Sequence, residues 1–276
     1  MSSGVADIEL RLLVEAVYLR YGHDFRDYAQ ASLQRRVRQA QQRMGAPSIS
    51  ALQERVLHDP GQFAELLQYL TVPVSEMFRD PGYFLAIRRH VAPVLRTYPS
   101  LKVWVAGCST GEEAYSMAIL LREEGLLERT ILYATDINHA SLGKARQGIF
   151  ALDAMQGFTR NYQQAGGERS FGDYYTAAYG GALMDKSLRD AITFADHSLA
   201  TDAVFAETQF VSCRNVLIYF NRGLQDRALG LFHESLAHRG FLGLGSRETL
   251  DFSAFAGAFE PVSRSERLYR RRAELS

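Results

Sequence analysis

Hydrophobic positions follow two different spacings along the chain. Over residues 1–70 they recur at helical spacing, as in IELRLLVEAVYLRY and ISALQERVLHDPGQFAELLQYL. Turns are expected at Gly45-Ala46-Pro47-Ser48 and at Asp59-Pro60-Gly61. Because strand-like alternation is lacking here, this pattern predicts short helices that form a small domain or cap rather than part of a sheet.

From about residue 100, β-rich runs alternate with helical patterns. LKVWVA at residues 101–106 and TILYAT at 130–135 predict strands, and the segments EEAYSMAILLREEG and HASLGKARQG that follow them predict helices. Further strands are expected at 191–195, 210–219 and 241–244, and FEPVSRSERLYRRR predicts a terminal hairpin at the sheet edge. This alternation is typical of right-handed βαβ units and of a parallel sheet covered on both faces.

The alternation breaks between about residues 150 and 190. Glycines and tyrosines gather there, and no amphipathic helix stands out. A short antiparallel β insertion and an irregular surface loop fit this segment equally well. The patterns together predict an α/β protein with a helical N-terminal domain over residues 1–75 and a larger domain over 76–276.

Composition narrows the class of protein further. The 276 residues are 47% hydrophobic and 22% charged, which excludes a disordered chain. The 31 basic and 31 acidic residues balance, which argues against bulk binding to nucleic acid or a membrane surface. A membrane-spanning apolar run and a signal peptide are both lacking, so a cytoplasmic location is expected. The two cysteines, Cys108 and Cys213, are too far apart for a CxxC site and are expected to be small packing residues.

The turn GCSTG after the first predicted strand is a candidate ligand site. Gly107 to Gly111 would let the backbone approach a ligand at the carboxyl end of the strand, where open α/β sheets bind ligands. The spacing is not GxGxxG, and Glu112 and Glu113 would repel a pyrophosphate but favour an ammonium and a sulfonium. Both glutamates also fit first-turn acids that favour the helix dipole, and the two roles can hold together.

Asp136 ends the second predicted strand, where α/β nucleotide-binding proteins place an acid that accepts hydrogen bonds from ribose. An isolated aspartate at a strand end is more often a helix cap. Combined with the glycine turn, Asp136 predicts an adenosine cofactor without a diphosphate. S-adenosylmethionine therefore fits better than NAD.

Polar residues in two other segments add to the candidate site. Arg79, in MFRDP, would by default be a solvated cation at a helix end. The run CRNVLIYF places Arg214, Asn215 and Tyr219 in an otherwise apolar strand and turn. Such polar groups need partners, either within the protein or on a ligand.

Together, MFRDP, GCSTGEEAYSMA, ATDIN, CRNVLIYF and GFLGLGSRE resemble the chemoreceptor glutamate methyltransferase (CheR) family over nearly the whole chain. The resemblance implies an enzyme that uses S-adenosylmethionine to methylate glutamate side chains on the cytoplasmic signalling helices of chemoreceptors, with S-adenosylhomocysteine as product. It also implies an all-α N-terminal domain, a Rossmann-like class I methyltransferase domain and a small β subdomain inserted at about 150–190. The family suggests a monomer.

The resemblance also assigns residues of the site. Cofactor contacts fall on Ser75, Arg79, Gly107, Glu113, Asp136, Ser198, Leu199, Arg214 and Asn215. Arg79 and Tyr219 are similar to the residues nearest the reacting methyl group, where they would orient the incoming carboxylate. Family members commonly have Asn at the positions of Pro73 and Ser198, so we expect cofactor binding to be weakened rather than abolished.

A basic run, ASLQRRVRQAQQRMG, carries Arg35, Arg36, Arg38 and Arg43 without an acid between them. A solvated helix face is the usual role of such a run. The resemblance implies a docking surface for the acidic methylation helices of a receptor, and we favour this hypothesis.

Three other functions remain open at this point. A non-catalytic S-adenosylmethionine-binding or scaffolding module is supported only by Pro73 and Ser198. An NAD-dependent oxidoreductase is disfavoured by the missing GxGxxG and by Glu112 and Glu113. A small-molecule methyltransferase is weakly disfavoured by the helical domain and the arginine run. We expect no metal site, because the seven histidines are not at metal-ligand spacing.

Overall fold

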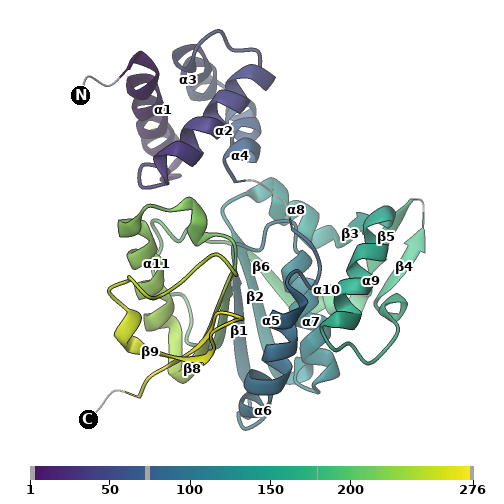
Figure 1. Ribbon diagram of the computed structural model, residues 1–276. Coiled ribbons are helices and arrows are strands. Elements are labelled where there is room, and N and C mark those ends of the chain that lie inside the picture. Colours follow the sequence, from purple (N-terminus) through teal and green to yellow (C-terminus); the bar gives the residue numbers. More distant parts are fainter. Residues whose placement is uncertain (1–3, 72–74, 179, 274–276) are drawn as a thin grey trace.

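The computed structural model describes residues 4–71, 75–178 and 180–273. The N-terminal part forms a helical bundle that stands on one side of a larger α/β body (Figure 1). Its helices are α1 (Val5–Tyr21), α2 (Gln30–Arg43), α3 (Ile49–His58) and α4 (Pro60–Thr71). Leu13, Val37, Leu52 and Leu66 are almost completely buried between them. The apolar stripes of the helices therefore form a core that belongs to the bundle itself.

Both turns expected in this region become helix boundaries. Ser48 caps α3, since its Oγ accepts a hydrogen bond from the Ala51 N–H at 3.0 Å. Helix α4 begins at Pro60, where a missing N–H costs nothing because the first turn has no acceptor for it.

The α/β body is built on a seven-stranded sheet in the order β6-β2-β1-β7-β8-β10-β9. Its strands are β1 (Leu101–Ala106), β2 (Thr130–Asp136), β6 (Ile192–Asp196), β7 (Thr208–Cys213), β8 (Leu236–Leu244), β9 (Phe259–Ser263) and β10 (Leu268–Arg271). Neighbours from β6 to β8 pair in parallel, whereas β9 and β10 form an antiparallel hairpin at the edge. The predicted α/β class and the terminal hairpin are confirmed.

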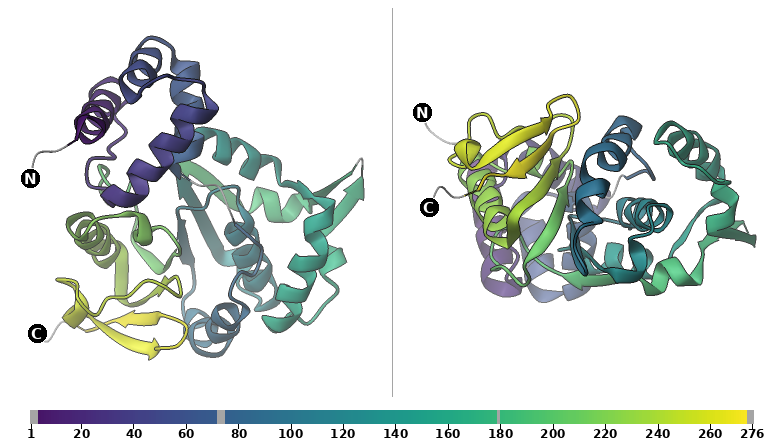
Figure 2. Two further views of the ribbon diagram at one scale, coloured as in Figure 1. Left: turned by 45° about the horizontal axis from the view of Figure 1, so that its top comes forward. Right: turned by 90° about the horizontal axis from the view of Figure 1, so that it is seen from below.

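Helices lie on both faces of this sheet (Figure 2). They are α5 (Pro81–Ala86), α6 (Ala92–Leu95), α7 (Glu112–Glu123), α8 (His139–Gln147) and α11 (Arg222–Ser235). Neighbouring residues of β1 point to opposite faces, so Val103 and Val105 join the α7 side while Trp104 packs edge-on against Phe232 of α11.

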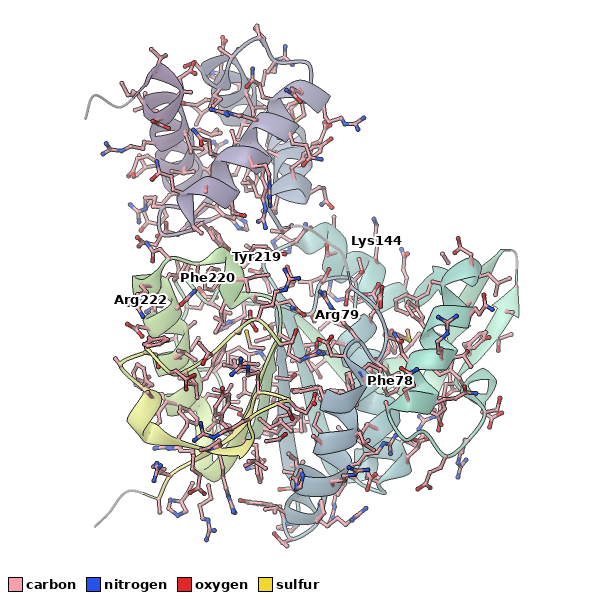
Figure 3. All side chains as sticks on the ribbon, in the orientation of Figure 1. Phe78, Arg79, Lys144, Tyr219, Phe220 and Arg222 are labelled. Carbon is pink, nitrogen blue, oxygen red and sulfur yellow. The ribbon has the colours of Figure 1, made fainter. Side chains whose placement is uncertain are left out.

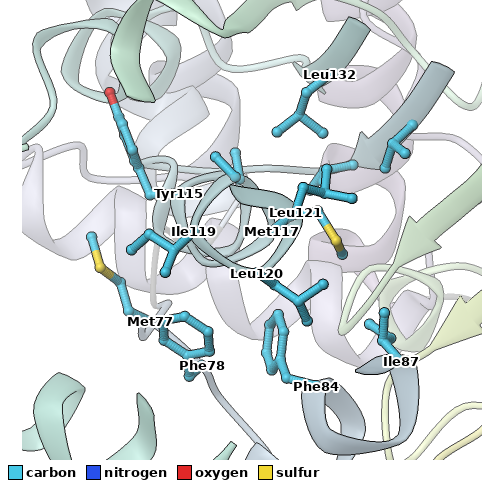
Figure 4. Close-up of a cluster of buried hydrophobic side chains, with 14 of the residues drawn as sticks. Met77, Phe78, Phe84, Ile87, Tyr115, Met117, Ile119, Leu120, Leu121 and Leu132 are labelled. Carbon is cyan, nitrogen blue, oxygen red and sulfur yellow. The ribbon is translucent and has the colours of Figure 1, made fainter. Parts of the chain in front are cut away.

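The core on the α7 side is aromatic and aliphatic (Figure 4). Leu120 of α7 faces Phe84 of α5, and Phe78 stands edge-on to Phe84 with ring centroids 5.0 Å apart. This packing anchors the segment that leads from the bundle into the α/β body.

A second, three-stranded antiparallel sheet lies beyond α8, on the side of the body away from α11 (Figure 1). Its order is β3 (Ile149–Ala151), β5 (Gly181–Met184) and β4 (Tyr175–Ala178). Two helices accompany it, α9 (Met155–Gln164) and α10 (Lys186–Asp190), so the expectation that this segment lacks an amphipathic helix is wrong. Met155, Phe158 and Tyr162 form the buried stripe of α9, at helical spacing that Gly157 and the polar neighbours obscure.

Among the described residues, hydrogen bonds tie the bundle to the body in two regions. Tyr28 and Phe220 form an isolated β-bridge, and the Ala29 N–H donates to the Tyr219 carbonyl at 2.8 Å. Elsewhere the Asn138 side chain, which caps α8, donates to Thr71 Oγ1 at 2.8 Å. These contacts hold the bundle over the carboxyl ends of the strands.

Candidate active site

A cavity of about 200 Å³ lies between the helical bundle and the carboxyl ends of β1, β2 and β7. The bundle contributes Tyr28, Arg36, Leu70 and Thr71 to its wall. The rest of the chain contributes all the residues predicted for cofactor binding or catalysis: Ser75, Arg79, Gly107, Glu113, Asp136, Ser198, Leu199, Arg214, Asn215 and Tyr219. Parallel strands end at one edge of the sheet, which explains why segments far apart in sequence meet here. Their individual roles remain predictions.

The glycine turn after β1 brings the backbone to the cavity. Gly107 has φ +74°, and a Cβ there would lie 2.4 Å from Cγ2 of Val216. The N–H groups of Gly107 and Cys108 donate to the Thr135 carbonyl at 2.8 and 2.9 Å, which ties the turn to the end of β2. The backbone therefore borders the cavity at a point that no side chain could share.

Asp136, the last residue of β2, fastens this turn. Its Oδ2 accepts the Ser109 N–H at 2.8 Å, and its Oδ1 accepts the Asn138 N–H at 2.9 Å. Burial raises the pKa of Asp136, although these backbone hydrogen bonds act against the rise. Asn138, not Asp136, is the cap of α8. The aspartate still has lone pairs available, as the predicted ribose contact requires.

The two glutamates that begin α7 have different surroundings. Glu112 is buried outside the cavity lining, where Thr110 Oγ1 donates to its carboxylate at 2.8 Å and burial raises its pKa. Glu113 borders the cavity and accepts hydrogen bonds from Ser212 Oγ at 2.6 Å and from Arg214 at 3.1 Å. Only Glu113 therefore faces the space that a ligand would occupy.

Arg214 connects the sheet to the segment before α5. Its Nη1 reaches Glu113, and its Nη2 donates to Asp80 Oδ2 at 2.7 Å and to the Arg79 carbonyl at 2.9 Å. The guanidinium also lies over the ring of Tyr83, with Cζ 4.2 Å from the centroid. Burial lowers the pKa of Arg214, but Glu113, Tyr83 and Asp80 together outweigh burial and raise it.

The strand expected over 210–219 is wrong beyond Cys213, where β7 ends. Asn215 has φ +60°, a left-handed conformation that a strand does not accommodate. A 3-10 turn, Leu217–Tyr219, follows and puts Tyr219 in the cavity wall. Strand β8 also begins earlier than expected, at Leu236.

Glu248 holds this irregular segment, and the sequence analysis assigned it no role. Its carboxylate accepts the N–H groups of Gly245 at 2.6 Å, Asn215 at 3.0 Å and Ile218 at 3.3 Å. Burial raises the pKa of Glu248, against the effect of these hydrogen bonds. A signal was present in the sequence, because Glu248 comes only three positions after the apolar run GFLGLG ends, and a glutamate there needs partners if it is buried.

Arg79 lies just before α5 in the chain and borders the cavity together with Tyr219 (Figure 3). The flanking residues Phe78 and Asp80 have φ of +52° and +55°, which is uncommon outside glycine. Ser116 Oγ accepts the Phe78 N–H at 2.8 Å, and Arg214 binds Asp80, so both neighbours are held in place. Among the described residues, no hydrogen bond or ion pair engages the Arg79 side chain, which borders the cavity half-buried.

Arg36 does not belong to the exposed docking surface predicted from the basic run, so that part of the prediction is wrong. Arg35, Arg38 and Arg43 are exposed on α2, whereas Arg36 is only 5% exposed and borders the cavity. The reason is helical spacing, which places Arg36 on the buried face together with Leu33, Val37 and Ala40.

The loop after β6 closes another side of the cavity. Ser198 is held by Asp202, whose Oδ2 accepts its N–H at 2.9 Å, and Leu199 is buried beside it. His197, which the sequence analysis missed, also borders the cavity, and no described residue is a hydrogen-bond partner of its Nδ1. Pro73, the other departure from the family pattern, lies outside the described residues.

Sheet order, glycine turn and cavity together define a class I methyltransferase fold with a site for an adenosine cofactor. In the part of the chain that the structure describes, no helix is both long and apolar enough to cross a membrane.

Comparisons with known proteins agree with this class. Residues 8–71 match the family model "CheR methyltransferase, all-alpha domain", and residues 73–266 match "CheR methyltransferase, SAM binding domain". A Pseudomonas putida protein named "Putative methyltransferase Cher3" is 67% identical over 96% of this chain and 97% of its own length. "Chemotaxis protein methyltransferase" of Listeria monocytogenes is 31% identical over 67% of this chain and 69% of its own. The chain belongs to the CheR methyltransferase family, and its cofactor is S-adenosylmethionine.

The residues present fit this cofactor. At Gly107 the backbone borders the cavity without a side chain, and Ser109 Oγ and His197 Nδ1 are buried polar atoms without a partner among the described residues. Glu113 and Asp136 supply carboxylates suited to an ammonium and to ribose hydroxyls.

Proposed function

We propose that the protein is a protein-glutamate O-methyltransferase that methylates side-chain carboxylates on the signalling helices of chemoreceptors. The observation that supports this proposal most is the position of Arg79 and Tyr219 in the wall of the same cavity as Glu113 and Asp136. A cation and a phenol thus border the site where an acceptor carboxylate would meet the cofactor.

The cofactor, when bound, supplies a methyl group that its sulfonium makes electrophilic. A glutamate acceptor has an ordinary pKa of about 4.3 and is already ionised at neutral pH, so it needs no general base. The protein's contribution is therefore positioning. Glu113 and Asp136 hold the cofactor, while Arg79 and Tyr219 orient the acceptor carboxylate.

The acceptor is proposed to be a helix of a receptor rather than a small molecule. Helix α2 contributes Arg36 to the cavity wall, and its exposed Arg35, Arg38 and Arg43 carry positive charge without an acid between them. Acidic methylation helices would complement this surface. The relative from Listeria carries chemotaxis in its name, which agrees with a receptor substrate.

Calorimetric titration with S-adenosylmethionine and S-adenosylhomocysteine tests cofactor binding. Asp136→Asn and Asp136→Ala should both weaken binding, and Asp153→Ala, an exposed site with the same loss of charge, should not. Receptor fragments incubated with radiolabelled cofactor should then acquire base-labile methyl esters. Cofactor binding without ester formation on any receptor fragment would favour a non-catalytic binding or scaffolding module instead.

A further inference from the structure

A second cavity lies at the edge of the sheet opposite β6, on the β9–β10 hairpin (Figure 1). Its volume is about 230 Å³, close to that of the candidate active site. One wall is the hairpin, and the other is the loop after β8, which contributes Leu250, Asp251 and Ala256. No described residue lines both cavities, so a ligand here would occupy a separate site.

The floor of this cavity is apolar and belongs to the core on the α11 side. Leu250, Phe259 and Tyr269 line the cavity and are almost completely buried. The Tyr269 hydroxyl has no hydrogen-bond partner among the described residues. The floor therefore offers aromatic surface together with a hydroxyl that can bind a ligand.

Three arginines also border the cavity. Arg264 and Arg267 come from the hairpin turn, and Arg272 follows β10. The Arg272 Nε donates to the Phe259 carbonyl at 3.2 Å, which holds that side chain beside the cavity. Asp251 is the one carboxylate among the described lining residues, and no ion pair in the described part of the chain joins an acid to these arginines. The cavity therefore has two positive charges in excess, in a chain whose net charge is zero.

The hairpin turn presents Arg267 at a conformational cost. Its φ is +54°, a left-handed conformation that glycine would adopt without strain. Its carbonyl accepts the Leu244 N–H at 3.0 Å, but no described residue forms a hydrogen bond or ion pair with its side chain. The neighbouring acid, Glu266, faces the start of α5 instead, where its carboxylate oxygens lie 3.0 Å from the position of a Cβ at Gly82. A strained residue with an unpartnered charge beside a cavity points to a ligand.

A phosphate group fits these surroundings better than a carboxylate. Guanidinium groups bind phosphate through paired N–H donors. A phosphate monoester carries a charge of about −1.5 to −2 at pH 7, which matches the excess of positive charge, whereas a carboxylate carries a single charge. The aromatic floor adds a surface on which a planar base can stack. Inorganic phosphate and a nucleotide therefore share the chemistry that this cavity would recognise.

We propose that the cavity on the β9–β10 hairpin binds a small phosphate-bearing anion. Arg264, Arg267 and Arg272 hold the phosphate group, and the base of a nucleotide would lie on Phe259 and Tyr269. This site goes beyond the proposed function and does not depend on it, because methyl transfer uses the other cavity.

The test is calorimetric titration of the full chain with inorganic phosphate and, separately, with 5′-AMP. The protein is first saturated with S-adenosylhomocysteine, so that the adenosine of the probe cannot enter the cofactor site. Both probes should bind, and Arg264→Gln and Arg267→Gln should each weaken their binding about tenfold or more, the loss of one charged contact. Arg247→Gln is the matched control, since Arg247 is exposed on the loop after β8 but does not line the cavity.

The two probes also distinguish the sources of the phosphate. Equal affinities would assign the site to inorganic phosphate, and tighter binding of 5′-AMP would assign it to a nucleotide whose base stacks on the floor. The proposal would be overturned if neither probe bound, if Arg264→Gln and Arg267→Gln bound as wild type, or if Arg247→Gln lost as much affinity as they do.

Thermal unfolding separates binding from a structural role of Arg267. Arg267→Gly removes the charge together with the backbone strain, so its melting temperature should be equal to or above that of wild type while its affinity for phosphate falls. Added phosphate should raise the melting temperature of wild type more than that of the double variant Arg264→Gln with Arg267→Gln. An equal rise in both proteins would reflect only the general effect of the salt and would contradict a specific site.

Discussion

Arg36 and Arg214 are both buried in the wall of one cavity, yet their surroundings are opposite. Arg214, on the sheet side, is held by two carboxylates and a carbonyl, with its side chain 1% exposed. Arg36, on the bundle side, has a carbonyl and an aromatic ring but no carboxylate among the described residues. The first arrangement is complete without a ligand and the second is not. The charge of Arg214 is thus compensated within the protein, whereas the charge of Arg36 has no carboxylate partner among the described residues.

Of the predictions here, replacement of Arg214 should change the free energy of unfolding most. Arg214→Met leaves Glu113 and its neighbours without their cation, so the free energy of unfolding should fall by about 3 kcal/mol or more. Arg36→Met, which strands no carboxylate, should change it by less than about 1 kcal/mol. Urea denaturation of the two variants measures both values, and equal losses would remove the distinction between the walls.

Substitution of Gly107 tests how closely the glycine turn packs against Val216. Gly107→Ala puts a Cβ against Val216 at a positive φ and should lower the free energy of unfolding by about 2 kcal/mol, with weaker binding of S-adenosylhomocysteine. Gly125→Ala is the matched control, since Gly125 has φ +68° but nothing within 4 Å of its Cβ position. The second-site change Val216→Ala should restore part of the loss in Gly107→Ala, and no recovery would mean that the clash is not the cause.

The exposed side of α2 tests the docking surface separately from Arg36. The double variant Arg35→Glu with Arg38→Glu should slow methylation of receptor fragments about tenfold by repelling an acidic helix. The difference from wild type should shrink at high salt, and cofactor affinity should stay the same. Arg11→Glu, on another helix, controls for total charge. Equal rates in the double variant and wild type would exclude α2 as a docking surface.

The smallest expected effect concerns Glu112, a buried carboxylate that forms no ion pair with any described residue. Because burial raises its pKa in the folded state, the stability linked to its protonated form is fully present below the unfolded pKa near 4.3 and is lost as pH rises through the folded value. Glu112→Gln cannot ionise, so its stability does not fall in this way as pH rises. As pH rises from 4 to 7, the free energy of unfolding of the variant should therefore increase relative to that of wild type, by less than about 1 kcal/mol. Urea denaturation at a series of pH values measures it, and a gain at low pH instead would contradict the assignment.

Much of the candidate site was predictable because each motif carries its own local chemistry. The turn at Gly107, the acid at Asp136 and the polar residues Arg214 and Tyr219 all border one cavity, as their places at strand ends led us to expect. Local motifs are informative here because the topology of parallel strands alone places their carboxyl ends at the same edge of the sheet.

The two errors have different physical causes. Arg36 was grouped with its charged neighbours, although Leu33, Val37 and Ala40 already mark its position as part of an apolar stripe. The strand expected to run to Tyr219 ends at Cys213, because Glu248 binds the N–H groups of a left-handed turn. The first error could have been avoided from near neighbours on the helix, whereas in the second a distant part of the chain decided the outcome.

The sequence by itself determined the helical bundle, the α/β class and the residue types of a cofactor site, since periodicity and turn chemistry depend on near neighbours. Only the tertiary structure decided which charges are compensated. Arg214 meets Glu113 and Asp80 across the sheet, and Arg36 meets Tyr219 across the boundary between bundle and body. Such pairings depend on packing between segments more than a hundred positions apart, and the energy of a buried charge depends on its whole surroundings rather than on its neighbours in sequence.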